Sequence, residues 1–451
     1  MTTIDKLEDV QGIVFSGYNK YMANCSYYLL KIDAAAKTKS WLKNLVEQNQ
    51  ITHGADKATA ETENRISLAI SYSGFEKLQL DQDSLYSFEL SFREGMHSEH
   101  RSALLGDRGI NDPSQWQWGS GGNSVDLLFI LFSKNDAIHS ASCKYHEKAF
   151  KGAGLSVVQR LDAGQKKQNV NGFDVEHFGF ADGVSDPLVD GFPTTSGTGD
   201  IATGEFLLGY PNQYDGKLTK MPQLGASGDA LGKNGTYLVL RQLKQDVGAF
   251  WAFMEEEAAR QGITADYLAA KFVGRWKSGA VVEPDQDTDP NKVDNSFNFT
   301  KDPHGQGCPL GSHIRRANPR SVGLGATEAE SLKVANRHRI LRRGRSYGSF
   351  LANPAQDDGN ERGLLFICLN ANIERQFEFV QHTWINSVKF AGLYDEDDPL
   401  IGSAVEDNRN FTIQDLPIRR RVCGFQQFVT TKGGSYFFLP SLSALGLLGG
   451  S

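Results

Sequence analysis

The chain has 451 residues, of which 39% are hydrophobic and 47 are glycine, and its formal net charge is −7 at pH 7. This length and composition predict a loop-rich globular protein with two domains of ordinary size. The acidic balance argues against a nucleic-acid-binding protein, and the longest apolar run, at 127–132, has the length of a strand rather than of a membrane span. We therefore expect neither nucleic acid nor a membrane as a partner.

The cysteines indicate a reducing compartment. They are odd in number, widely spaced and without a CxxC pair, which argues against a disulfide framework and a structural zinc site. They are Cys25, Cys143, Cys308, Cys368 and Cys423. The first nine residues carry neither an apolar signal segment nor a twin arginine, so we expect a cytoplasmic protein.

The first half of the chain alternates patterns that are typical of strands and of helices. Short apolar stretches bounded by turn residues predict strands, and apolar side chains at helical spacing predict helices. The expected elements are strands at 12–17, 25–32, 65–72 and 125–132, and helices at 33–47 and from 136 to about 151. This half is therefore expected to be α+β.

The second half repeats the same order. Its expected elements are strands at 236–243 and 363–369, each followed by a helix, at 247–261 and 373–385. A stretch rich in Gly, Pro, Ser and Thr at 190–199 separates the two halves. We therefore expect two domains, 1–210 and 211–451, each an antiparallel sheet with helices on one face.

The segment 179–187, with the sequence GFADGVSDP, holds the carboxylate of Asp182 between glycines in an apolar setting. A carboxylate held in this way is suited to proton transfer. The same pattern of Asp and Gly is also typical of a tight turn, in which the side chain bonds to the nearby backbone. The residues alone leave both interpretations open.

Two later segments offer a histidine and fixed cations. His313 lies in the segment 308–316, with the sequence CPLGSHIRR, and a single histidine is more often a hydrogen-bonded structural residue than a ligand. Arg342 lies in the segment 339–344, RILRRG, whose arginines are equally compatible with a solvated basic surface. Neither residue identifies a site without the other.

Taken in order, GFADG at 179–183, HIRRANPR at 313–320 and RILRRG at 339–344 resemble the motifs of the dye-decolourising peroxidases, a family of haem enzymes. Further landmarks extend the resemblance over nearly the full length. The long insertions and the closing strand are similar to the longer C/D-type, fungal-like members. The resemblance implies two ferredoxin-like domains of the dimeric α+β barrel superfamily, with haem held mainly by the C-terminal one.

The resemblance also implies a role for each candidate residue. Asp182 is expected to move the proton of the peroxide, and Arg342 to stabilise the charge on the departing oxygen. His313 is expected to be the proximal iron ligand, with Asp398 as the acceptor that orients its ring. The remaining implied roles are Arg315 as partner of a haem propionate, Leu364 and Phe366 as walls of the distal pocket, and Tyr347 as a surface radical site.

Several of these roles have plainer alternatives. Acidic residues at 395–397 adjoin Asp398, so an ordinary acidic loop also explains that segment. Leu364 and Phe366 fit simple core packing in an apolar strand, and Tyr347 fits packing at the end of a strand. These alternatives stay open at the level of sequence.

As a whole, the resemblance implies a haem b peroxidase. Such an enzyme uses hydrogen peroxide to oxidise bulky aromatic reductants, such as anthraquinone dyes and phenols, by one-electron steps through an oxoferryl intermediate. An oligomer is compatible with these features. The alternative functions are a haem-handling protein of the deferrochelatase kind and an αβ module that binds a small ligand without chemistry.

Overall fold

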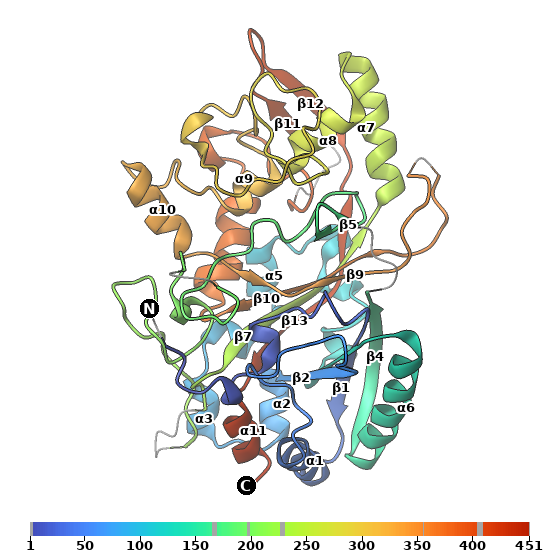
Figure 1. Cartoon of the computed structure of the whole chain (residues 1–451), viewed down its shortest axis with the longest axis vertical. Helices are drawn as coiled ribbons and strands as arrows, with labels where there is room; N and C mark the ends of the chain where they lie inside the picture. The colour runs from blue at the N-terminus through green and yellow to red at the C-terminus, as the bar shows by residue number, and fades with distance from the viewer. Residues whose placement is uncertain are drawn as a thin grey trace.

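A nine-stranded antiparallel sheet runs through the centre of the protein (Figure 1). The computed structural model describes residues 3–164, 169–195, 199–225, 231–354, 356–403 and 409–450. The strands of the sheet are β1 (Asn24–Ile32), β2 (Asn64–Ile70), β3 (Leu127–Ser133), β4 (Leu155–Ala163), β7 (Thr236–Gln245), β8 (Leu341–Arg342), β9 (Arg345–Tyr347), β10 (Gly363–Asn370) and β13 (Val429–Leu439). Two small hairpins lie outside it, β5 (Asn169–Val170) with β6 (Phe173–Asp174), and β11 (Arg409–Ile413) with β12 (Arg420–Phe425).

The helices connect these strands and cover the sheet. The α-helices are α1 (Ala35–Glu47), α2 (Tyr72–Lys77), α3 (Gln82–Ser87), α4 (Leu90–Glu94), α5 (Glu99–Leu105), α6 (Asp136–Gly152), α7 (Val247–Gln261), α8 (Ala265–Val273), α9 (His313–Ala317), α10 (Glu328–Asn336) and α11 (Leu442–Leu448). Wider π-type turns form η8 (Glu374–Glu378) and η9 (Val380–Ile385). In the part of the chain that the structure describes, no helix is long and apolar enough to span a membrane.

The strand order shows the same unit twice. The sheet reads β4-β1-β3-β2-β13-β7-β10-β8, with β9 also paired to β10. If β8 and β9, which both pair with β10, are counted as one strand, the strands of each half stand in the order fourth, first, third, second. Helical segments follow the first and third strands of each half. This repeated arrangement confirms the predicted α+β fold with ferredoxin-like sheets. The two sheets join at their edges into one.

The seam between the two halves is narrow. Between β2 and β13 only Ile70 and Phe438 form a strand pair. The amide of Gln11 reinforces the seam, because its Nε2 donates to the carbonyl oxygens of Leu68 and Pro440 at 2.7 and 2.9 Å, while its Oε1 accepts from the Leu68 N–H. Gln11 is 1% exposed, so no water competes for these bonds.

Packing on both faces explains the apolar strands. All residues of β3 are buried, because one face packs against the helical side of the first half and the other against the N-terminal segment. Strands covered on both sides read as continuous apolar runs, as the sequence 127–132 does. In Figure 1, α11 lies beside α1 at the lower end of the molecule, while α7, α8 and the β11–β12 hairpin form the upper end. A third core cluster joins these upper elements.

Two expected elements differ from those observed. Residues 12–14 form a 3₁₀ turn, not part of a strand, and the N–H groups of Val14 and Phe15 bond to carbonyls within the turn. The helix expected at 373–385 forms the π-type turns η8 and η9. There Gln376 is completely buried and donates to the carbonyls of Glu205 and Arg339. Local hydrogen bonds thus close the turn at 12–14, whereas distant partners hold Gln376 within the π-type turns.

Candidate active site

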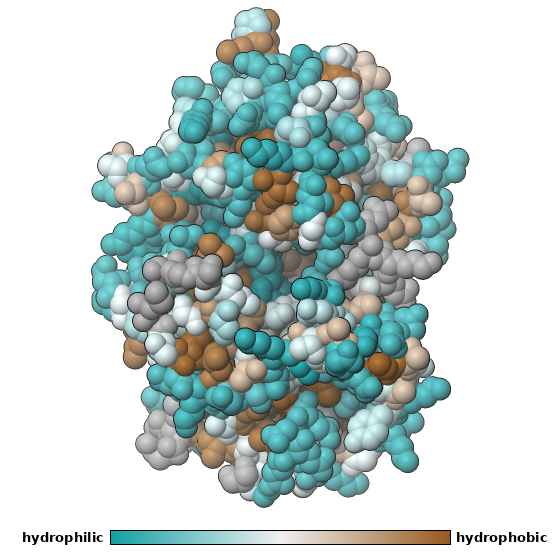
Figure 2. Space-filling model, viewed as in Figure 1, coloured by the Kyte–Doolittle hydropathy of each residue, from teal (hydrophilic) through white to brown (hydrophobic). Residues whose placement is uncertain are grey.

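A cavity of about 640 Å³ lies where the loop 174–186 faces β8, β10 and α9. Its walls are mostly apolar, and its polar side chains come from segments far apart in the chain. Figure 2 shows the face of Figure 1 with a hollow near its middle that hydrophobic and hydrophilic residues border. This volume is in the range of cavities that hold cofactors and drug-sized ligands.

Asp182 enters the cavity from a tightly turned loop. Gly179 and Gly183 have φ values of +98° and +86°, which other residues rarely adopt. The Asp182 backbone N–H donates to the Asp174 carbonyl at 2.8 Å, and its side-chain Oδ1 accepts the Gly183 N–H at 2.7 Å. The turn expected from the sequence and the presented carboxylate are therefore both present.

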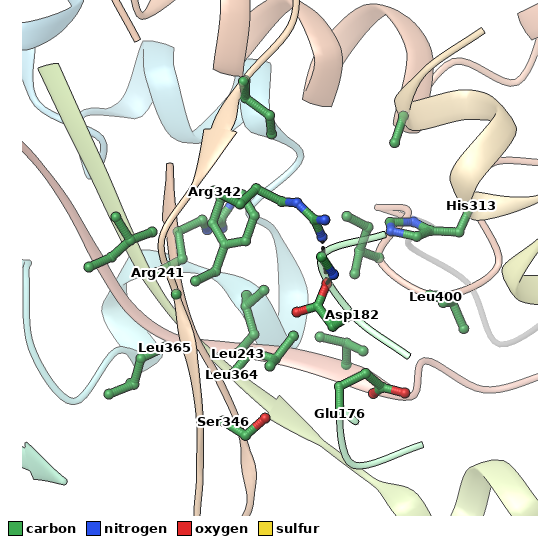
Figure 3. A pocket seen from close by; sticks show the side chains of 18 of the residues that line it. Glu176, Asp182, Arg241, Leu243, His313, Arg342, Ser346, Leu364, Leu365 and Leu400 are labelled. Carbon is green, nitrogen blue, oxygen red and sulfur yellow. Dashed lines mark hydrogen bonds and ion pairs between the residues drawn. The ribbon is translucent and has the colours of Figure 1, made fainter. Parts of the chain in front are cut away.

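Arg342 is the arginine that pairs with this carboxylate. Its Nη1 donates to Asp182 Oδ1 at 2.8 Å, and its Nη2 to Asp186 Oδ1 at 3.1 Å, as Figure 3 shows for Asp182. The charge of Asp182 and then that of Asp186 outweigh burial and raise the pKa of Arg342. The guanidinium therefore stays charged between two carboxylates.

The neighbouring arginines serve the fold. Arg343 donates to the carbonyls of Ile13 and Val14, and Arg345 to those of Gly17 and Met22. Arg339 donates to the Ser185 carbonyl at 2.8 Å. The sequence could not distinguish these arginines, but their hydrogen-bond partners do: only Arg342 bonds to Asp182.

His313 is the first residue of α9, and its ring reaches the cavity from the side opposite Arg342 (Figure 3). Its Nδ1 lies 2.9 Å from Asp398 Oδ2. Burial alone would lower the pKa of His313, but the charge of Asp398 and this hydrogen bond outweigh it, so the pKa is raised. Among the described residues, Nε2 has no hydrogen-bond partner, and 28% of the side chain is exposed.

Asp398 is the acid of its loop that reaches the histidine. Asp395 pairs with Arg421 at the surface, Glu396 accepts the Thr412 N–H, and Asp397 pairs with Arg409. The Asp398 side chain is fully buried, and its Oδ1 accepts the N–H groups of Leu400 and Ile401 at 2.9 and 3.0 Å.

The pKa of Asp398 reflects these contacts. Burial raises it, but the charge of His313, their hydrogen bond and the Ile401 N–H together hold the pKa below its usual range. Asp398 is therefore an ionised acceptor that fixes the ring of His313.

Strand alternation brings Leu364 and Phe366 to the cavity. Both are half-buried and line it. Leu365 and Ile367, on the opposite face of β10, also border the cavity but are fully buried and belong to a core cluster. Figure 3 shows Leu364 and Leu365 pointing to opposite sides of the strand. Leu364 and Phe366 thus line the same cavity as Arg342.

Arg315 does not line the cavity. Its guanidinium donates to the carbonyls of Cys308 and Asp302 at 2.8 and 2.9 Å and stacks over Phe299. The expected pairing with a haem propionate is therefore not what the structure provides. Ile314, the residue before Arg315 in α9, lines the cavity. The side chain of Arg315 instead contacts the 302–308 loop.

Arg275 and Arg339 are the cations that the sequence reasoning missed. Both line the cavity, and neither lies within 4 Å of a carboxylate among the described residues. Arg275 instead donates to the carbonyls of Gly279 and Asp294. Burial lowers the pKa of both guanidinium groups to about 10, and Arg320 shares the acceptor Asn295 with Arg275. Asp294 acts on Arg275 and Asp186 acts on Arg339 only at a distance, since among the described residues neither carboxylate forms an ion pair with these arginines. Arg320 and Arg339 stand in the motifs at 313–320 and 339–344 without an assigned role, and Arg275 stands in none.

Tyr347 is buried, with 9% of the residue exposed, and its hydroxyl donates to Glu361 at 3.0 Å. Burial raises its pKa, and the charge of Glu361 adds to that effect. The expectation of a surface position for Tyr347 is therefore wrong, because β9 turns this side chain into the core.

Comparisons with known proteins agree with this geometry. Residues 205–391 match the family "Dyp-type peroxidase, C-terminal". The chain is 31% identical to Peroxidase 2 of the fungus Mycetinis scorodonius over 97% of its own length and 86% of that protein. The crystal structure of the DyP-type peroxidase of Anabaena sp. is similar with a TM-score of 0.79 and 27% identity, over 98% of this chain and 94% of that one.

A dye-decolourising peroxidase in complex with 2,6-dimethoxyphenol is also similar, with a TM-score of 0.78 and 25% identity over 99% of this chain and 100% of the other. A deferrochelatase of Yersinia pestis is 37% identical, but over only 19% of this chain. The match to peroxidases extends along the whole chain, whereas the match to the haem-handling protein is short. The chain therefore belongs to the dye-decolourising peroxidases, a family of haem-dependent oxidoreductases.

Proposed function

We propose that the cavity holds haem b, with His313 as the iron ligand through Nε2. The donor set supports this assignment, because a ligating histidine donates its other N–H to an acceptor that fixes the ring, and Asp398 is such an acceptor. The sequence has no CxxC pair and so no site for covalent attachment of the c type. The apolar walls suit a porphyrin ring.

We propose Arg275 and Arg339 as the partners of the two haem carboxylates. Guanidinium groups bind carboxylates with charge-assisted hydrogen bonds. The observation that supports them is their position at the cavity without a carboxylate partner among the described residues. A bound carboxylate would compensate charges that burial now disfavours.

Haem, when bound, supplies the one-electron chemistry and the iron at which the peroxide bond is broken. We propose that Asp182 accepts the proton of the inner peroxide oxygen and returns it to the outer oxygen as that oxygen departs. The fixed charge of Arg342 stabilises the negative charge that develops on the departing oxygen. Leu364 and Phe366 keep bulk water from the same space.

We propose aromatic reductants, phenols and anthraquinone dyes, as the electron donors. The complex of a similar peroxidase with 2,6-dimethoxyphenol supports this class of substrate. Since Tyr347 is buried and bonded to Glu361, we do not assign to it the oxidation of large substrates. We also propose a reducing compartment, which the odd number and wide spacing of the cysteines support.

We further propose that the chain divides into domains at about residue 210. The order of strands supports this boundary, since β1–β4 occupy one end of the sheet and the later strands the other. A single strand pair joins them.

The proposal rests on one observation: two charged pairs face the same cavity, His313 with Asp398 and Arg342 with Asp182. Haem reconstitution tests it. The wild type should give a Soret band that changes after one equivalent of peroxide. In His313→Ala the band should weaken or shift, whereas the exposed control His304→Ala should match the wild type.

The distal residue is tested separately. Asp182→Asn should bind haem normally but react with peroxide about 10²–10⁴-fold more slowly, whereas the exposed control Asp287→Asn should not differ from wild type. An unchanged peroxide rate in Asp182→Asn would contradict the assigned proton transfer. A wild type without a Soret band would contradict the haem site itself.

A further inference from the structure

The loop that presents Asp182 is built around a second carboxylate, that of Glu176. The Gly179 N–H donates to the Glu176 carbonyl at 2.8 Å, and the Glu176 N–H donates to the Phe180 carbonyl at 3.1 Å. The side-chain oxygens then accept the N–H groups of Phe178 and Phe180, at 2.9 and 3.0 Å. Three consecutive N–H groups, at 178–180, are thus bonded to one residue.

Glu176 also connects the loop to the central sheet. Gln245, the last residue of β7, donates its Nε2 to Glu176 Oε2 at 2.6 Å. Burial raises the pKa of Glu176 to about 7, even though these donors act in the opposite direction. Glu176 is half-buried at the cavity wall, and its three donors occupy both side-chain oxygens.

The rest of the loop is fixed to the second half of the protein by contacts that continue from Glu176. Phe178 packs on Phe250 of α7, and its carbonyl accepts the Trp251 indole N–H at 3.2 Å. The next backbone N–H along the chain, that of Ala181, donates to the Lys277 carbonyl at 3.0 Å. Asp182 follows directly, so its position depends on the turn that Glu176 closes.

We propose that Glu176 is a positioning residue, whose carboxylate folds the 176–180 turn and thereby places Asp182 against Arg342. The inference rests on the proposed role of Asp182. Glu176 lines the same cavity, yet its oxygens are occupied by two backbone N–H groups and one amide, so it acts through the loop. A misplacement of about 1 Å at a reacting group can lower a rate about 100-fold.

The two oxygens of a carboxylate can both accept, whereas an amide of the same shape has one acceptor and one donor. Glu176→Gln therefore loses one of the two backbone bonds, and Glu176→Ala loses both. In the double variant Glu176→Gln with Gln245→Glu, the 176–245 bond is restored with reversed polarity, but one of the two backbone N–H groups still lacks its side-chain acceptor. This double variant separates pairing with β7 from closure of the turn.

The first measurement is amide hydrogen exchange of the segment 174–183 in the haem-free protein. Exchange at Phe178 and Phe180 should be about 10-fold faster in Glu176→Gln and faster still in Glu176→Ala, and the double variant should not recover. The exposed control Glu283→Gln should match the wild type. Wild-type exchange in Glu176→Ala, or full recovery in the double variant, would overturn the proposal.

The second measurement uses the haem-loaded protein. Glu176→Ala should keep the haem affinity of the wild type within about twofold, since His313 is untouched, but react with peroxide 10- to 100-fold more slowly. Equal losses in haem binding and in peroxide reaction would indicate a general structural defect and overturn the positioning role. If the wild type itself bound no haem, the proposed function would fail, while the exchange experiment would still decide the role of Glu176.

Discussion

The two sides of the cavity hold their charged groups in different ways. On the His313 side, Asp398 is fully buried and accepts from the histidine and from two backbone N–H groups. On the Arg342 side, the ion pair is open, with 36% of the Arg342 side chain and 43% of the Asp182 side chain exposed. The first arrangement fixes a geometry, and the second leaves a charged pair within reach of a small reactant.

The difference follows from how each carboxylate is anchored. Backbone N–H groups cannot turn away, so they hold Asp398 rigidly and keep it ionised. Arg342 is shared between Asp182 and Asp186, so each carboxylate can release one arm of the guanidinium while the other keeps it in place. The following predictions test this contrast.

After Asp182→Asn, the largest effect on the rate is expected for Arg342→Leu. Loss of a preorganised charge at a developing anion lowers the rate by about 10²–10³-fold, so the reaction with peroxide should slow by this factor while the haem affinity stays unchanged. Stopped-flow absorption and haem titration measure the two quantities. Arg419→Leu, an exposed arginine, is the control. An equal loss of haem affinity would contradict the assignment of haem binding to the His313 side and of the peroxide reaction to the Arg342 side.

A smaller effect of the opposite kind is expected for Asp398→Asn. Removing the outer partner of a metal-bound histidine costs about 10–100-fold in metal affinity or activity, so this variant should lose haem affinity. Haem titration against apo-myoglobin measures it, and Asp395→Asn, which removes an exposed acid of the same loop, is the control. An unchanged affinity would mean that the ring of His313 is held by its helix alone.

The stability of the haem-free protein should depend on pH through the buried pair. The pKa of His313 is raised in the folded protein. The His313–Asp398 pair therefore stabilises the fold fully at a pH below the pKa of an unfolded histidine, about 6.5. This stabilisation is lost as the pH rises through the pKa that His313 has in the folded protein. The difference in unfolding free energy between wild type and Asp398→Asn should therefore shrink between pH 6 and 9. Urea unfolding at several pH values measures it. For Arg342→Leu the guanidinium stays charged over this range, so no such trend should occur.

The smallest effect is expected for Asp186→Asn. Exposed ion pairs contribute about 0.2–1 kcal/mol, so the variant should react with peroxide within about fivefold of the wild-type rate. The loss should fade at high salt, because ions screen exposed charges. A loss as large as that of Arg342→Leu would show that Asp186 belongs to the reacting group and does not merely hold the arginine.

Local sequence was enough to predict most strands and helices, and alternation within 363–369 already separates the cavity face of β10 from its core face. It failed at 12–14, which form a 3₁₀ turn instead of a strand. At 373–385 it predicted the helix but not its π-type turns, within which Gln376 bonds to the distant carbonyls of Glu205 and Arg339. The motifs located Asp182, His313 and Arg342, but they could not choose among adjacent arginines or acids.

The sequence by itself determined the fold class and the family, since local periodicity and short ordered motifs carry that information. The tertiary structure decided the partners. Asp182 meets Arg342 across 160 residues and His313 meets Asp398 across 85, while Arg315 turns away and Arg275 and Arg339 take the charged end of the cavity. Which cation meets which anion depends on distances and burial that exist only after the two halves join, and no local pattern encodes them.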